Sequence, residues 1–186
     1  MSTVSIEIPK TLYEEATRSG IDIEELILTA IIKTLRLDPE TTMKARLELA
    51  MKYLDEGEAL IDRDPAQASE KLYRAAEEVV KALAQYYDLK DVLSRVEGRG
   101  RWTVTDLEKA VLAISRTLGD RVRHSWDTAN YLHVWGFHET KLDPEDVRER
   151  VPDIEKMVQE AQKNTNKTRQ INTQPNITNT HHNEET

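Results

Sequence analysis

Three Asp-Pro dipeptides, at positions 38–39, 64–65 and 143–144, divide the chain and indicate where its helices begin. An Asp side chain accepts hydrogen bonds from the free N–H groups of a first helical turn, and Pro at the first helical position loses no hydrogen bond. Hydrophobic residues recur at helical spacing after each dipeptide. The pattern predicts helices over 39–62, 65–87 and 105–118, one from about 120 into 124–139, and one after 144.

The connections between these helices are short, and the segment 94–102, SRVEGRGRW, contains two glycines and is predicted to be a loop. Long amphipathic helices joined by short loops are typical of an antiparallel bundle. Pro152 should kink or restart the last helix, because proline lacks the backbone N–H that a helix interior needs. The predicted fold class is therefore all-α, with an antiparallel helical bundle over residues 38–163.

The first 37 residues form a separate predicted unit. Apolar and polar residues alternate over 4–8, as in a half-buried strand, and two helices follow, the second beginning at Asp22. This strand–helix–helix order resembles the ribbon–helix–helix fold, in which two chains pair their strands and the ribbon enters DNA. Residues 1–42 carry four basic and eight acidic residues, so DNA is disfavoured as a partner. We expect a homodimerisation segment, and a DNA-binding regulator is a further alternative.

Composition argues against several classes of protein. The 186-residue chain has a formal net charge of −8 and no cysteine, which disfavours general attraction to nucleic acid and excludes disulfides and thiolate sites. No run approaches 18 apolar residues, so we expect a cytoplasmic protein with no membrane partner. Residues 164–186 hold six of the seven asparagines and few hydrophobic residues, and are predicted to be a disordered tail.

One region is basic within this acidic chain. Residues 90–124 carry eight basic and five acidic residues, and a glycine-containing loop there places arginines beside a tryptophan. Such a loop can hold a phosphate or stack a base, while a solvated loop with surface arginines is the alternative interpretation. The candidate ligand-binding residues of this region are Arg99, Arg101, Trp102 and Arg121.

The stretch HSWDTANYLHVWGFHE at 124–139 holds two of the three tryptophans and three of the five histidines. On a helix its bulky residues fall on two faces, which favours burial of Trp126 and Leu132 in the core. The members that could face a ligand are His124, Tyr131, Trp135 and His138. No histidine pair here has the i, i+4 spacing of a helical zinc site, so no metal or other cofactor is expected.

Six segments of the chain carry a family resemblance. They are IPKTLYEEATRSGIDIEELI near the N-terminus, ASEKLYRAAEEVVKALA at 68–84, GRW at 100–102, LEKAV at 107–111, WDTANYLHVWGFHE at 126–139 and VPDIEKMV at 151–158. Together they resemble the archaeal PaREP1 family over about residues 4–162, and the resemblance implies a bundle similar in fold to the HEPN proteins. It implies no activity of the family itself, although the wider HEPN group includes RNA-cutting members.

The ribonuclease members of that group carry an Arg followed, after four to six residues, by a His. Counting back from His124, His133 and His138 reaches no arginine at those positions. The expected function is therefore a non-catalytic homodimeric binding or assembly module, for which a nucleotide or RNA is the candidate partner. A divergent HEPN-type ribonuclease that uses Arg123, His124 and His138 is the alternative.

Overall fold

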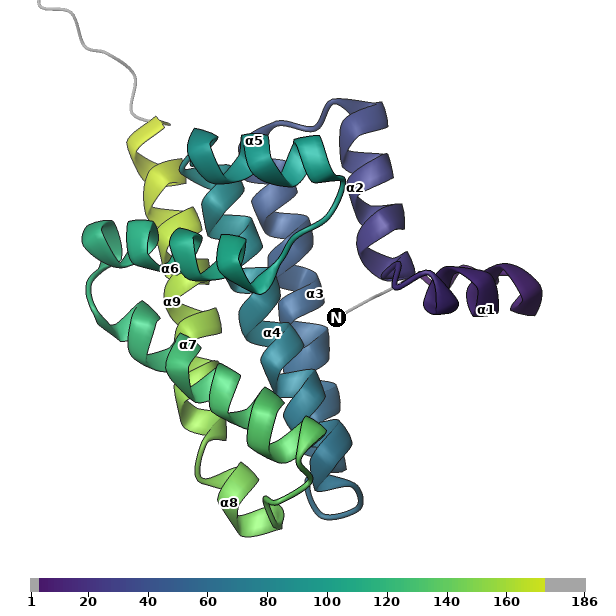
Figure 1. Ribbon diagram of the computed structural model, residues 1–186. Coiled ribbons are helices and arrows are strands. Elements are labelled where there is room, and N and C mark those ends of the chain that lie inside the picture. The colour runs from purple at the N-terminus through teal and green to yellow at the C-terminus, as the bar shows by residue number, and fades with distance from the viewer. Residues whose placement is uncertain (1–3, 173–186) are drawn as a thin grey trace, which may run out of the picture.

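The computed structural model describes residues 4–172, with side chains described for residues 4–164, and every regular element in this part of the chain is helical (Figure 1). Short connections link consecutive helices into a bundle. The elements are α1 (Lys10–Arg18), α2 (Ile23–Leu35), α3 (Pro39–Leu60), α4 (Pro65–Tyr86), α5 (Lys90–Arg99), α6 (Val104–Leu118), α7 (Arg121–Tyr131), the π-helix η1 (Leu132–His138), α8 (Pro144–Arg148) and α9 (Val151–Asn172).

Helix α4 is the centre of the bundle. It pairs along its length with α3, and α6, α7, η1 and α9 pack around it (Figure 1). The core includes Trp126 and Leu132, both fully buried as predicted, and the indole Nε1 of Trp126 donates to Glu108 Oε1 at 2.8 Å. The predicted all-α helical bundle is confirmed. Among the helices of residues 4–172, none has the length and apolarity needed to cross a lipid bilayer.

The three Asp-Pro dipeptides begin helices as predicted. Asp38, Asp64 and Asp143 each accept a hydrogen bond from the backbone N–H three residues later, at 3.0, 3.0 and 2.9 Å. Each is followed by Pro in the first turn of its helix. Pro152 lies in the first turn of α9, just after α8 ends, so it restarts the chain as a new helix.

The predicted loop over 94–102 is wrong in its first part. Helix α5 extends to Arg99 and ends at Gly100, which adopts the left-handed conformation with φ of 75°. A glycine in this conformation is a common helix C-terminus, so the pattern marks a helix end as well as a loop. The next helix, α6, begins at Val104 and not at 105 as predicted, and Thr103 caps it by accepting from the Asp106 N–H at 3.3 Å.

The predicted N-terminal strand is absent. Residues 4–9 have no regular structure, and no strand lies beside them in the part of the chain that the structure describes. A strand is completed by hydrogen bonds to a neighbour, so alternation alone cannot form one. The two helices that follow are confirmed, and Asp22 caps the second by accepting from the Glu25 N–H at 3.1 Å.

The C-terminal helix is longer than composition predicts. Helix α9 continues to Asn172, so residues 164–172 are helical where disorder is predicted. Each residue added to an existing helix gains a hydrogen bond without a new nucleation step, which favours extension even of a polar sequence. The rest of the predicted tail, 173–186, lies outside the described residues.

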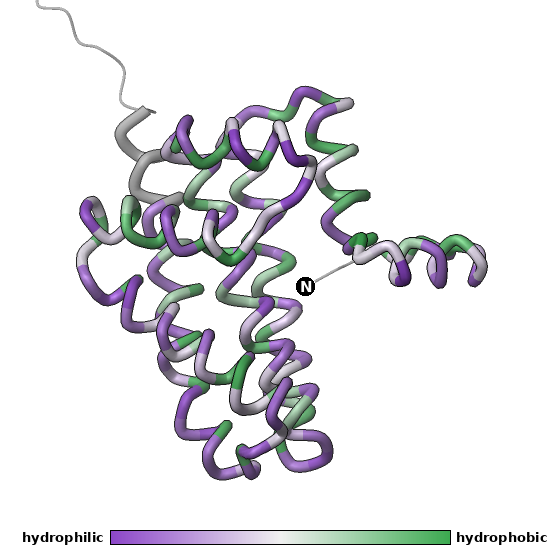
Figure 2. Tube along the Cα trace, in the orientation of Figure 1, coloured by the Kyte–Doolittle hydropathy of each residue, from purple (hydrophilic) through white to green (hydrophobic). Residues whose placement is uncertain are grey.

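The N-terminal unit, α1 with α2 and the segment before them, lies at one side of the bundle, and α1 points away from it (Figure 1). Neither helix has a buried residue. The hydropathy colouring shows hydrophobic residues along both helices (Figure 2). Eight of the thirteen large hydrophobic side chains exposed in the described structure belong to this unit: Val4, Ile6, Leu12, Tyr13, Ile21, Leu26, Ile31 and Leu35.

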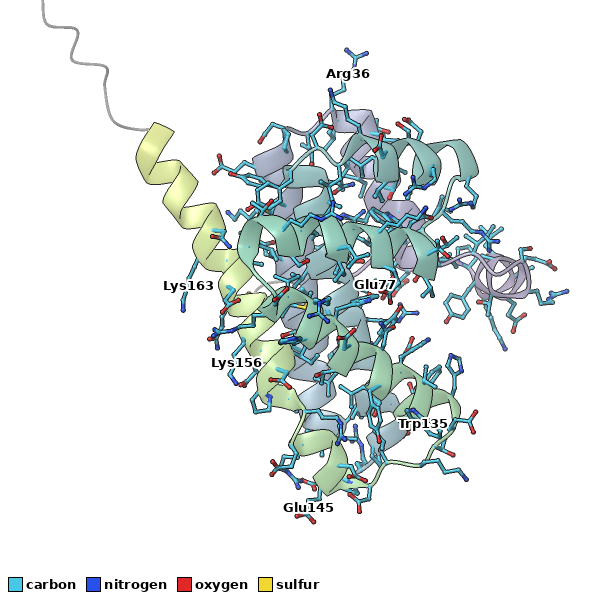
Figure 3. The ribbon with its side chains drawn as sticks, turned by 60° about the vertical axis from the view of Figure 1, so that its left-hand side comes forward. Arg36, Glu77, Trp135, Glu145, Lys156 and Lys163 are labelled. Carbon is cyan, nitrogen blue, oxygen red and sulfur yellow. The ribbon has the colours of Figure 1, made fainter. Side chains whose placement is uncertain are left out.

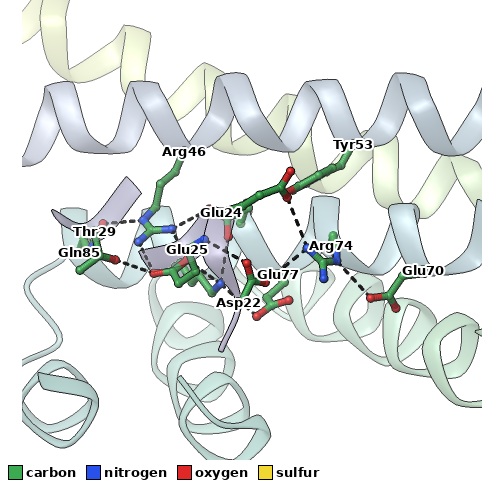
Figure 4. A network of polar contacts seen from close by, with 12 residues as sticks. Asp22, Glu24, Glu25, Thr29, Arg46, Tyr53, Glu70, Arg74, Glu77 and Gln85 are labelled. Carbon is green, nitrogen blue, oxygen red and sulfur yellow. Dashed lines mark hydrogen bonds and ion pairs between the residues drawn. The ribbon is translucent and has the colours of Figure 1, made fainter. Parts of the chain in front are cut away.

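Buried ions attach α2 to the bundle (Figure 4). Arg46 of α3 is fully buried and donates to Glu25 of α2 at 2.9 Å and to Glu78 of α4 at 2.7 Å. Lys81 of α4 donates to the same two carboxylates at 2.9 and 3.0 Å. Buried charges are costly unless paired, so these bonds fix the position of α2. Burial raises the pKa of Glu25, but Arg46 and Lys81 outweigh it and lower that pKa to about 2.

Candidate functional site

The stretch 124–139 lies mostly in α7 and η1, which form one continuous helical rod against α4. Trp126, Ala129 and Leu132 are fully buried on its inner side. Tyr131 and Trp135 are exposed on its outer side, at 40% and 46%, and Trp135 stands at the surface (Figure 3). The stretch 124–139 thus contributes to the core with one face of the helical rod and to the surface with the other.

The π-helical turn η1 packs closely against α4. A Cβ added at Gly136 would lie 2.1 Å from Ser69 Oγ and 2.5 Å from Ser69 Cβ on α4. Only glycine fits against Ser69 at this distance. Gly136 lies inside η1, where the absence of a side chain makes room for α4.

The π-turn places His133 and His138 side by side, with their Nε2 atoms 3.1 Å apart and their rings edge to face. The Nδ1 of His133 lies 2.8 Å from Glu70 Oε2 of α4, and Tyr73 stacks on the His133 ring at 4.1 Å. Arg74 donates to the other oxygen of Glu70 at 3.1 Å. Burial raises the pKa of Glu70, but the hydrogen bonds from His133 and Arg74 outweigh it and hold that pKa below its usual range.

The outer face of the rod carries an aromatic–arginine platform, defined as Tyr131, Trp135 and Arg150. The guanidinium of Arg150 lies over the Tyr131 ring at 4.4 Å. The Tyr131 and Trp135 rings are 6.4 Å apart with an interplanar angle of 37°. Two exposed aromatic rings beside an arginine can stack a planar group and pair with an anion.

Comparison with known proteins places this bundle in a family. The model of the archaeal PaREP1/PaREP8 family matches residues 45–158, which include the histidine pair and the platform. The chain belongs to the archaeal PaREP1/PaREP8 family. The matched region begins within α3, so α1 and α2 lie outside it.

Solved structures agree with this assignment to the PaREP1 family. A crystal structure of a Sulfolobus solfataricus protein is similar with 36% sequence identity and a TM-score of 0.57, over 63% of this chain and 95% of that one. A solution structure carrying the same structural-genomics target label has 36% identity and a TM-score of 0.55, over 63% of this chain and 91% of that one. No curated protein matches the sequence.

The predicted basic loop residues are largely engaged within the PaREP1 bundle. Arg99 Nη1 donates to Asp106 Oδ2 at 2.5 Å, and Arg95 donates to the other oxygen at 3.2 Å. Burial raises the pKa of Asp106, but hydrogen bonds from Thr103, Arg99 and Arg95 lower it to about 2. Arg95 and Arg99 of α5 therefore pair with the single carboxylate of Asp106 and join α5 to α6.

The two other candidate residues of that loop differ in how far they are buried. Trp102 is half-buried and packs against the hydrophobic core, whereas Arg101 is exposed. A cavity of about 580 Å³ lies nearby, beside the start of α5. Its lining residues are Asp88, Leu89, Lys90, Asp91, Val92, Arg95, Lys109 and Ala113.

The predicted catalytic trio does not assemble. Arg123 Nη2 lies 3.4 Å from His124 Nε2, whereas His138 contacts His133. His124 and His138 are fourteen positions apart on one helical rod, which separates them by about 20 Å along its axis. Arg121, a further candidate, donates to Glu160 of α9 at 2.6 Å.

Two residues of the histidine site, Glu70 and His133, were not among the sequence candidates. Glu70 is 63 positions from His133 along the chain, so no local pattern links them. The five-residue interval between His133 and His138 is a signal only for a π-helix. A glycine inside that interval, Gly136, is the feature that hints at such a turn.

Proposed function

We propose that this PaREP1 protein is a non-catalytic homodimeric binding module, with the exposed hydrophobic surface of the N-terminal unit as its dimer contact. The eight exposed side chains of that unit are the observation that supports the proposal. Monomeric proteins rarely expose large apolar patches, and such patches mark association surfaces.

A second copy suits this surface better than nucleic acid does. Asp22, Glu24 and Glu25 are turned to cations of the bundle, since Arg74 lies 3.3 Å from Asp22 and Arg46 2.9 Å from Glu25 (Figure 4). The acidic side of α2 is thus used internally, and its apolar side is left for association. A self-complementary apolar patch is what a two-fold dimer needs.

The aromatic–arginine platform is the proposed ligand surface, and single-stranded RNA or a nucleotide is the proposed ligand. Trp135 offers an exposed ring for base stacking, with Tyr131 beside it, and the Arg150 guanidinium that lies over the Tyr131 ring offers a positive charge for phosphate. Stacking of this kind tolerates any base, so the expected binding has little sequence preference.

Light scattering on the full chain tests the dimer. The variant Leu26→Ser/Ile31→Ser/Leu35→Ser should be monomeric at concentrations where the parent is dimeric. Val104→Ser/Leu112→Ser is a matched control, because these exposed hydrophobic residues lie on α6, away from the proposed contact. A monomeric parent, or a dimer that survives the triple substitution, would contradict the proposal.

Fluorescence anisotropy with a labelled oligouridine RNA at low salt tests the ligand. Tyr131→Ala/Trp135→Ala should weaken binding at least tenfold, since each stacked base is worth about 1–3 kcal/mol. Leu112→Ala truncates an exposed side chain of α6, outside both the platform and the proposed dimer contact, and should leave binding unchanged. Equal affinity in both variants would remove the platform from the proposal.

A divergent HEPN-type ribonuclease is a second candidate, favoured by the Glu70–His133–His138 arrangement. A carboxylate that orients one imidazole against another is suited to general acid–base catalysis. Cleavage of labelled RNA that is lost in His133→Ala and His138→Ala but kept in His124→Ala would support this candidate over the binding module. No cleavage by the parent protein would reject it.

A further inference from the structure

The π-helical turn converts an unremarkable histidine spacing into a facing pair. Residues five apart on an α-helix point about 140° away from each other. In a π-helix each turn is wider and the hydrogen bonds join residues five apart, so positions 133 and 138 come closer to the same side. The resulting Nε2–Nε2 distance of 3.1 Å is set by the backbone of η1.

This distance suits two ligands of one metal ion. Imidazole nitrogens bind Zn²⁺ at about 2.0–2.1 Å, so two of them in tetrahedral geometry lie about 3.3 Å apart. The Nε2–Nε2 separation is therefore within a few tenths of an ångström of the value for two ligands of one ion, and rotation of the exposed His138 side chain would aim its lone pair at that ion.

The contact with Glu70 prepares His133 to be a ligand. A carboxylate can only accept, so the His133 Nδ1, 2.8 Å from Glu70 Oε2, carries the proton. The tautomer with this single proton has a lone pair on Nε2, the atom that lies 3.1 Å from His138 Nε2. Metal-binding histidines in general donate their second nitrogen to a carboxylate in this way, which fixes the ring and increases its basicity.

The surroundings hold this geometry without blocking it. Tyr73 stacks on His133, and the Gly136–Ser69 contact locks η1 against α4. His138 is exposed, so an ion can reach the pair from solvent. Arg74 neutralises Glu70 from its other oxygen, which keeps that carboxylate in place as a partner of His133.

We propose that His133 and His138 bind a divalent transition-metal ion of the Zn²⁺ class through their Nε2 atoms, with Glu70 as the positioning residue. No group of three or more acidic, histidine or cysteine ligands occurs within the described residues. The protein therefore supplies two ligands, and water occupies the remaining coordination positions. An ion with open positions can exchange ligands, and neutral imidazoles favour Zn²⁺, Ni²⁺ and Cu²⁺ over Mg²⁺ or Ca²⁺.

Isothermal titration of the full chain with ZnCl₂ alone tests this site. His181 and His182, which lie outside the described residues, are first replaced by Gln so that they cannot contribute. In this background we expect one Zn²⁺ per chain, and affinity at least tenfold lower in His133→Gln and in His138→Gln. His124→Gln is the matched control, because it removes an exposed histidine of the same rod, and should bind as the parent does.

Two further variants test the geometry while both ligands remain. Glu70→Gln should weaken Zn²⁺ binding about tenfold, in line with the loss of a carboxylate partner of a ligand. Gly136→Ala should weaken it because the added Cβ clashes with Ser69, and Ser69→Gly in the same chain should restore it. Circular dichroism on each variant separates a lost site from a lost fold. Absence of Zn²⁺ binding in the parent, or unchanged binding in the folded His133→Gln/His138→Gln chain, would overturn the proposal.

Discussion

Helices α2 and α4 show that an apolar sequence and a buried helix are different things. Seven of the thirteen residues of α2 are Ile or Leu, yet none is buried. Only four of the twenty-two residues of α4 are Val or Leu, yet thirteen residues are buried, including Glu78 and Lys81. Position in the bundle decides burial, because α4 is covered by several helices and α2 lies on one side.

Buried ion pairs hold α2 to the bundle. Glu25 of α2 reaches Arg46 and Lys81, and its apolar neighbours Leu26 and Ile31 remain exposed, while other apolar residues of α2 are half-buried. Fully buried apolar side chains thus distinguish the bundle core, and buried ion pairs distinguish the attachment of α2. The two regions should respond differently to substitution and to pH.

The largest effect is expected in the apolar core. Trp126→Ala removes a fully buried indole and should lower the free energy of unfolding by about 3–5 kcal/mol. Urea denaturation followed by circular dichroism measures this loss. Trp135→Ala, which truncates an exposed indole, should change it by less than about 0.5 kcal/mol. Similar losses from both variants would contradict the division of the rod into core and surface.

The ion network should respond strongly to loss of a single partner. Arg46→Met removes one of the two buried cations that Glu25 and Glu78 share, which leaves two carboxylates facing Lys81 alone, and should cost about 3 kcal/mol of unfolding free energy. Adding Glu25→Gln and Glu78→Gln in the same chain should recover part of that loss, because two carboxylates are neutralised while Lys81 keeps its ion pair with Glu77 at 3.1 Å. If the triple variant is no more stable than Arg46→Met, unpaired charge is not the cause.

Acid should weaken the attachment of α2 before the core. The pKa of Glu25 falls from 4.5 to about 2 on folding, so its contribution is present above pH 4.5 and is lost as pH falls toward 2. The full shift corresponds to about 3 kcal/mol. Unfolding curves between pH 6 and 2.5 should decline less steeply for Glu25→Gln than for the parent. Parallel curves would show that another carboxylate governs this range.

The smallest effect on folding is expected at the N-terminal surface. Leu26→Ser/Ile31→Ser replaces exposed side chains, so the unfolding free energy of dilute, monomeric protein should change by less than about 0.5 kcal/mol per substitution. The same variant should lose association, since its effect lies in the contact between copies. A large loss of monomer stability would mean that this face of α2 packs on its own bundle.

Local signals in the sequence predict much of this architecture. The Asp-Pro starts, the helical periodicity and the burial of Trp126 all depend on residues close in sequence, and all are confirmed. The prediction of an N-terminal strand is wrong because it, too, used only a local signal. Alternation is a local signal, but a strand requires a partner that the sequence pattern cannot supply.

The histidine site could not be predicted in the same way. His133 meets Glu70 through the packing of η1 on α4, and their separation of 63 positions hides the pair. The assumption of 3.6 residues per turn also places His133 and His138 on different sides, which is why the sequence argues against a metal there. The requirement for glycine at position 136 becomes clear only in the folded structure, where Ser69 of α4 lies against it.

The sequence by itself determined which segments are helical, where most of them begin and which side of each is apolar, because capping and periodicity act over a few residues. Only the tertiary structure decided which helix became the centre, which charges were buried in pairs, and that one turn widened into a π-helix. These outcomes depend on contacts between distant segments, and a 2.1 Å conflict between Ser69 and any side chain at position 136 is invisible until α4 and η1 are packed together.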